Sequence, residues 1–169
     1  MSENRSQDIQ LIKIAIQIEK DGEHFLERFQ TRLGESSSLK SFVQQMLDEA
    51  AADREAFENL LVPLESVQNT DKIEDISLDD YVKDLQKTRS EKFYPHTKAE
   101  ELFDRNFNPI HVLAYCVDTW NELSNFYSIS SGDIFYENEK KAFEEISSRK
   151  KEQAEQIAKK KKEVIARFP

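Results

Sequence analysis

Apolar residues recur at helical spacing along most of the chain. The clearest stripe lies in residues 12–29 and consists of Ile12, Ala15, Ile16, Leu26 and Phe29. Glu19 and Gly22 fall on the same stripe. A carboxylate in an apolar stripe is costly unless it is paired or binds a metal, and a glycine there indicates close packing. The pattern predicts a long helix over residues 6–33 whose Glu19 faces a specific partner.

Three further long helices are expected, over residues 39–61, from 108 to 129 and from 134 to near the end of the chain. The inner stripe of the second consists of Phe42, Met46, Ala50, Asp53, Phe57 and Leu60. We expect Gly34 to supply a left-handed cap and Val62-Pro63 to end the second helix. Asn108-Pro109 is an N-cap followed by proline at the first helical position. No alternating strand pattern is present.

The connection over residues 62–107 is too long to be without structure. It is predicted to hold two short helices, 77–86 and 97–104, and to cross between two antiparallel helix pairs. Taken one at a time, the helices of the first pair also match those of the second without gaps. Residues 12–26 fall on 113–127, and residues 46–60 fall on 146–160 with the same intervals between inner positions. The sequence therefore predicts one all-α domain, residues 1–169, built from two copies of a helical hairpin.

Composition narrows the classes of partner. The net charge is −9, which argues against general binding of nucleic acid. No run of about 18 apolar residues or apolar signal core is present, so we expect no membrane partner. The single cysteine, Cys116, indicates a reducing cytoplasm. Residues 149–169 carry eight basic and three acidic side chains, a local +5 that leaves −14 elsewhere. We expect this basic last helix to lie against acidic helices.

The pattern Ala15-x-x-x-Glu19-x-x-Gly22-x-x-Phe25 resembles the first helix of the rubrerythrin branch of the ferritin-like family. Residues 46–60 resemble that family's second helix in length and spacing. The resemblance implies a ferritin-like four-helix bundle with a long crossover between its second and third helices. It also implies two iron ions held by a Glu from the first and third helices and a Glu-x-x-His from each of the others. Because the family commonly pairs bundles side by side, it further implies a homodimer.

Most of the implied iron ligands are replaced in this chain. Glu19 is kept, but the second-helix pair falls on Ala50 and Asp53, and the third-helix Glu falls on Trp120. The fourth-helix pair falls on Lys150 and Gln153. We call these six the vestigial positions: Glu19, Ala50, Asp53, Trp120, Lys150 and Gln153. The substitutions predict a degenerate di-iron site with no bound metal, no cofactor and no catalytic residue.

Two interpretations of Lys150 stay open. It could pair with Glu19 and Asp53 in place of a metal, or it could point to solvent like most lysines of a polar helix. Two functions follow. The first is a non-catalytic structural or interaction protein. The second is an atypical iron-binding oxidoreductase, acting in iron oxidation or peroxide reduction, that uses Glu19 and Asp53. Its further ligands would come from Glu49, Asp118 or Glu122. His24, His96 and His111 lack metal-binding spacing and are predicted to be surface or capping residues.

Overall fold

The computed structural model of the chain describes residues 2–35, 37–68 and 92–167. The named elements in these ranges are all helical: α1 (Ser2–Arg32), α2 (Leu39–Gln68), α4 (His96–Glu100), the π-helical turn η1 (Glu101–Arg105), α5 (Pro109–Ser131) and α6 (Glu137–Arg167). No strand occurs among the described residues. The predicted all-helical class is therefore confirmed.

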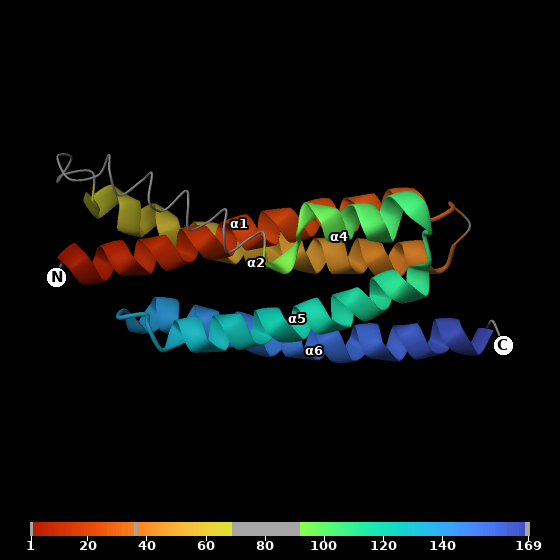
Figure 1. Cartoon of the computed structure of the whole chain (residues 1–169). Helices are drawn as coiled ribbons and strands as arrows, with labels where there is room; N and C mark the ends of the chain where they lie inside the picture. Colours follow the sequence, from red (N-terminus) through yellow and green to blue (C-terminus); the bar gives the residue numbers. More distant parts are fainter. Residues whose placement is uncertain (1, 36, 69–91, 168–169) are drawn as a thin grey trace.

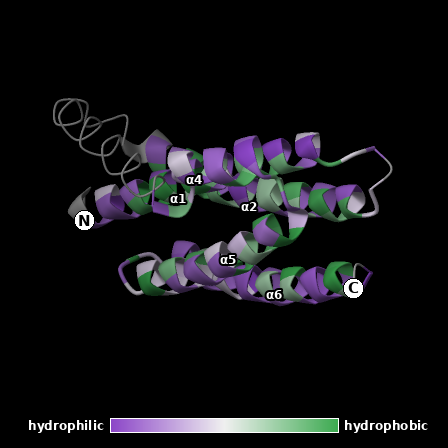
Figure 2. Cartoon of the chain, turned by 45° about the vertical axis from the view of Figure 1, so that its right-hand side comes forward, coloured by the Kyte–Doolittle hydropathy of each residue, from purple (hydrophilic) through white to green (hydrophobic). Residues whose placement is uncertain are grey.

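The four long helices form two hairpins that lie alongside each other (Figure 1). One hairpin is α1 with α2, the other is α5 with α6, and each is closed by a short turn. The short helix α4 and the adjoining η1 lie against one helix of each hairpin. Phe103 of η1 packs on Phe25 of α1 at 5.0 Å between ring centroids, and Nζ of Lys98 on α4 lies 5.8 Å from the ring of Tyr115 on α5. Residues of all four long helices form one apolar core, to which Phe29, Phe57, Leu113 and Phe143 contribute fully buried side chains. Hydrophobic and hydrophilic residues alternate along the helices of both hairpins, as expected for faces turned toward and away from that core (Figure 2).

The predicted end of the second helix at Val62-Pro63 is wrong, because α2 continues through Pro63 to Gln68. Proline at this position removes the backbone hydrogen bond to the carbonyl group of Asn59. Both Pro63 and Asn59 are exposed. Water can therefore satisfy that carbonyl group, and the helix does not have to stop.

Two more helix ends differ from the prediction. Gly34 was expected in the left-handed conformation, but no described glycine has positive φ. The helix α6 begins at Glu137 and not at residue 134. The amides of Phe135 and Tyr136 instead donate to the carboxylate of Asp8 on α1, at 3.0 and 3.1 Å. The Asn108 cap is confirmed, since its side chain accepts from the amide of Ile110 at 2.9 Å.

The connection between the hairpins is anchored by aromatic residues that precede α4. Phe93 is buried, and Tyr94 packs on the ring of Phe25 at 5.6 Å between centroids. A Cβ atom on Gly22 would lie 2.9 Å from the hydroxyl oxygen of Tyr94, so the close packing expected of Gly22 is confirmed. The short helix predicted over residues 97–104 corresponds to α4 and η1 together. The one predicted over 77–86 lies outside the described residues.

Most apolar residues of α1 beyond its main stripe are buried, and Leu11 is half-buried against the core. Ile9 and Ile14 are 4% exposed and Ile18 is fully buried. The side of α1 that these residues occupy therefore supplies no argument for a second subunit, and the homodimer stays a prediction of the family resemblance. Among the described residues, no helix is long and apolar enough to cross a membrane.

Candidate functional site

The side chains of Glu19, Asp53 and Lys150 meet in the centre of the core. Glu19 comes from α1, Asp53 from α2 and Lys150 from α6. The ammonium Nζ of Lys150 lies 2.6 Å from Oε1 of Glu19 and 3.1 Å from Oδ2 of Asp53. Each of the three residues is at most 1% exposed. We call these three residues the buried triad.

Regular helical spacing brings the triad together. Ala15 and Glu19 are one turn apart on the inner face of α1, and both are buried. Asp53 follows the buried Ala50 at the same kind of interval on α2, and Lys150 lies between the buried Ile146 and Ala154 on α6. Each charged group therefore occupies a position at which its helix would otherwise place an apolar side chain. Of the two interpretations of Lys150, the structure supports the buried pair.

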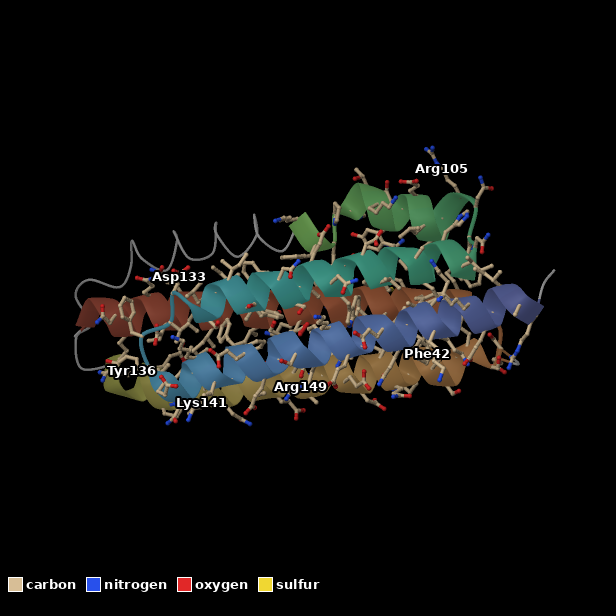
Figure 3. The ribbon with its side chains drawn as sticks, turned by 90° about the horizontal axis from the view of Figure 1, so that it is seen from below. Phe42, Arg105, Asp133, Tyr136, Lys141 and Arg149 are labelled. Atoms are coloured by element: carbon tan, nitrogen blue, oxygen red, sulfur yellow. The ribbon has the colours of Figure 1, made fainter. Side chains whose placement is uncertain are left out.

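A second cation completes the charge balance. Arg149, which lies on the side of α6 that faces α2 (Figure 3), donates to Oδ1 of Asp53 from Nε at 3.0 Å and from Nη2 at 2.8 Å. Asp53 thus uses one oxygen for Arg149 and the other for Lys150. Two carboxylates face two cations, which is the arrangement that makes buried charge tolerable. Sequence reasoning missed Arg149, because its position beside Lys150 does not reveal that its side chain turns back toward α2.

Trp120 and Gln153 close the site on the side of α5. The indole Nε1 of Trp120 donates to Oε1 of Gln153 at 3.1 Å, and both side chains are buried. The Nζ atom of Lys150 lies 5.7 Å from the Trp120 ring, within range of a cation–π interaction. Trp120 therefore fills space next to the triad. Ala50 is also buried and occupies little volume there.

Burial and charge act in opposite directions on the triad. Burial raises the pKa of Glu19 to about 7, and the Lys150 ammonium limits that rise. Burial also lowers the pKa of Lys150, but the carboxylates of Glu19 and Asp53 outweigh it, and the net shift is upward. Lys150 consequently stays charged at neutral pH, while Glu19 titrates close to neutrality. Protonation of Glu19 therefore changes the charge at the centre of the molecule.

Two tyrosine hydroxyls lie near the triad without a hydrogen-bond partner among the described residues. They belong to Tyr94, in the segment before α4, and to Tyr127 on α5. Burial and the nearby charge of Glu19 raise the pKa of both well above the ordinary value. Their phenols therefore stay neutral. Tyr127 was not singled out from the sequence, since a tyrosine on an apolar stripe gives no sign of polar surroundings.

The donor set does not fit a pair of metal ions. Ala50, Trp120 and Gln153 offer no anionic ligand, and the Lys150 ammonium already occupies the position between the two carboxylates. Among the described residues, no group of three or more His, Cys, Asp or Glu side chains is placed to hold a metal. The alternative ligands are dispersed. Asp118 and Glu122 are exposed, and Glu49 accepts a hydrogen bond from Gln45 at 3.1 Å.

The remaining candidates are not part of the site. His24, His96 and His111 are exposed, as predicted. Cys116 is buried and free. Comparison of the chain with protein-family models, with curated proteins and with solved structures finds no match.

Proposed function

We propose that the chain is a ferritin-like four-helix bundle of the rubrerythrin type, with a crossover between α2 and α5, whose di-iron site has been replaced by an internal ion-pair cluster. In this proposal the domain is a non-catalytic structural or interaction protein. The observation that carries the proposal is the position of the Lys150 ammonium, at ion-pair distance from both Glu19 and Asp53.

The replacement is electrostatically self-consistent. In a di-iron site the metal cations neutralise the ring of carboxylates that surrounds them. Here the number of carboxylates is reduced, and Lys150 and Arg149 supply the positive charge that the two remaining ones need. Trp120 adds volume at the same place. The cluster therefore does for folding what the metals do in the resembled family, without supplying a site for oxygen or peroxide chemistry.

Iron content is the direct test of this proposal. Protein purified from cells grown with added iron should contain no stoichiometric iron, and exposure to air after addition of ferrous iron should produce no near-ultraviolet absorption band of a protein-bound diferric centre. A matched variant, Glu19→Gln with Asp53→Asn, removes both carboxylates and controls for iron bound elsewhere. About two irons per chain, as a di-iron centre requires, that disappear in this variant would overturn the proposal and favour the iron-dependent oxidoreductase.

A further inference from the structure

One end of the molecule carries more basic than acidic side chains, although Glu35, Asp104 and Glu163 belong to the same segments. The basic side chains there come from α1, α2, η1 and α6, and we call them the basic end: Arg32, Lys40, Arg105, Lys159, Lys160, Lys161, Lys162 and Arg167. Contacts hold these segments together, because Nη1 of Arg167 donates to Oγ of Ser38 at 3.1 Å and the Arg32 guanidinium lies 5.2 Å from the Phe107 ring. Arg105 projects outward at this same end (Figure 3).

The lysine run of α6 is largely free of partners. Within the described residues, Lys159, Lys161 and Lys162 form no ion pair. Lys160 pairs with Glu163 on its own helix at 3.6 Å and lies 5.7 Å from the ring of Phe42. The expectation that this basic segment pairs with acidic helices is therefore not met for the run. Its positive charge is available to an external partner.

The arrangement of the four lysines indicates the shape of that partner. Successive residues of an α-helix are rotated by about 100°, so four in a row cover about 300° of the circumference. A nucleic-acid strand or an acidic peptide lying along one face of the helix would reach only part of this collar. A flat anionic surface that meets the end of the molecule would interact with the lysines on every side of the helix except that of Lys160, which packs on Phe42.

Residue types narrow the partner further. The run contains lysines, which act as point charges, whereas recognition of individual phosphates favours the forked contacts of arginine. One turn beyond it, Ile165 is 45% exposed, and Figure 2 shows hydrophobic positions among the hydrophilic ones in the last turns of α6. An exposed aliphatic side chain beside a lysine cluster suits insertion between lipid headgroups. The phosphate backbone of a nucleic acid offers the Ile165 side chain no apolar environment.

We infer that the basic end binds the surface of an anionic lipid membrane, with the long axis of the molecule directed away from it. Outside the eight side chains of the basic end the chain carries a formal charge of −17, which repels the same surface and orients the molecule end-on. The contact is peripheral and needs no membrane-spanning helix. The expectation of no membrane partner rested on the absence of a spanning segment and did not consider this surface.

Co-sedimentation with vesicles tests this inference. The wild-type chain should bind mixed phosphatidylcholine–phosphatidylserine vesicles, fail to bind pure phosphatidylcholine vesicles, and lose binding as salt is added. The triple variant Lys159→Glu, Lys161→Glu, Lys162→Glu should abolish binding, since each charge removed weakens it about fivefold. The matched control, Lys140→Glu, Lys141→Glu, Lys151→Glu, changes the net charge equally on other turns of α6 and should retain most of the binding.

Ile165→Ser separates a membrane from a plain polyanion. It should weaken vesicle binding severalfold and leave any residual binding to duplex DNA unchanged. Absence of binding to the phosphatidylserine vesicles would overturn the inference. Equal losses in the two triple variants would also overturn it, because binding would then follow net charge alone. A third outcome would also overturn it: the chain binds duplex DNA more tightly than vesicles, and Ile165→Ser changes neither affinity. That result would identify the partner as a nucleic acid. Circular dichroism of each variant verifies that it is folded.

Discussion

At the scale of single residues, Lys150 decides whether the centre of the molecule is stable. Lys150→Met keeps the length of the side chain and removes its charge, which leaves Glu19 unpaired and Asp53 with Arg149 alone. Removing one partner of a buried ion pair costs about 3–5 kcal/mol. Chemical denaturation near pH 8 should show this loss, whereas Lys151→Met, at an exposed neighbouring position, should change little. Adding Glu19→Gln to Lys150→Met should recover part of the stability. A loss of stability in Lys151→Met but not in Lys150→Met would contradict the assignment of Lys150 as the buried partner of Glu19 and Asp53.

Glu19 should make the stability of the protein depend on pH near neutrality. Its pKa is about 7 in the folded chain against an ordinary value of 4.5. The folded chain then holds more protons than the unfolded chain between these values, so the free energy of unfolding decreases as the pH rises through this window. Glu19→Gln removes the titration. The free energy of unfolding of the wild type, minus that of the variant, should therefore fall by up to about 3 kcal/mol between pH 4.5 and pH 7. If urea denaturation gives the same difference in stability between wild type and variant throughout this pH window, the pKa of Glu19 is not raised.

Trp120 should contribute mainly by volume. Trp120→Ala leaves a cavity beside the triad and removes the donor to Gln153, and such a truncation costs about 3–5 kcal/mol. Trp120→Phe keeps a ring and should cost less. Ile129→Ala is the control on the same helix, because Ile129 is 72% exposed. Thermal unfolding of Trp120→Ala close to the wild-type temperature would show that Trp120 is outside the core.

At the scale of helices, Gly22 connects α1 to the segment before α4. Alanine is favoured over glycine in a helix by about 1 kcal/mol. A Cβ atom here would, however, lie 2.9 Å from the hydroxyl oxygen of Tyr94, whose ring packs against Phe25 and Trp120. Gly22→Ala should therefore destabilise the wild type. In a Tyr94→Phe background, where that oxygen is absent but the ring carbon Cζ would still lie 3.3 Å from the added Cβ atom, the same change should cost less. Urea denaturation of the four chains measures the coupling, and equal effects in both backgrounds would rule out the contact.

Much of the helical architecture could be predicted because apolar spacing fixes the buried face of each helix. Most inner positions of the four long helices are buried, although Phe42 and Leu60 are only half-buried. The helix-by-helix match between the two halves aligned Trp120 with Glu19 and Gln153 with Asp53. Long-range contacts decided the rest. Pro63 does not end α2 because it faces solvent, and α6 starts late because Asp8, remote in sequence, holds the preceding amides. The direction taken by the Lys150 and Arg149 side chains also depends on neighbours that spacing within one helix cannot specify.

At the scale of the whole molecule, polar contacts join the two hairpins at three levels. Asp8 binds the α5–α6 turn at one end, the buried triad and Arg149 connect the middle, and Arg167 contacts Ser38 at the other end. Their environments differ. Asp8 and the triad are buried, whereas Arg167 is exposed. The energetic link between the hairpins should therefore be concentrated in the first two contacts.

Asp8→Ala tests this distribution. It removes the acceptor of two backbone amides, those of Phe135 and Tyr136, and hydrogen bonds to a charged group contribute about 1.5–3 kcal/mol. Arg167→Ala removes an exposed contact and should change stability by less than about 0.5 kcal/mol. Hydrogen exchange adds a local measurement, because only Asp8→Ala should accelerate exchange at Phe135 and Tyr136 while the centre of α5 stays protected. If instead Arg167→Ala proves the more costly change, the hairpins are held together at the basic end, and the protein should open first at the turn between α5 and α6.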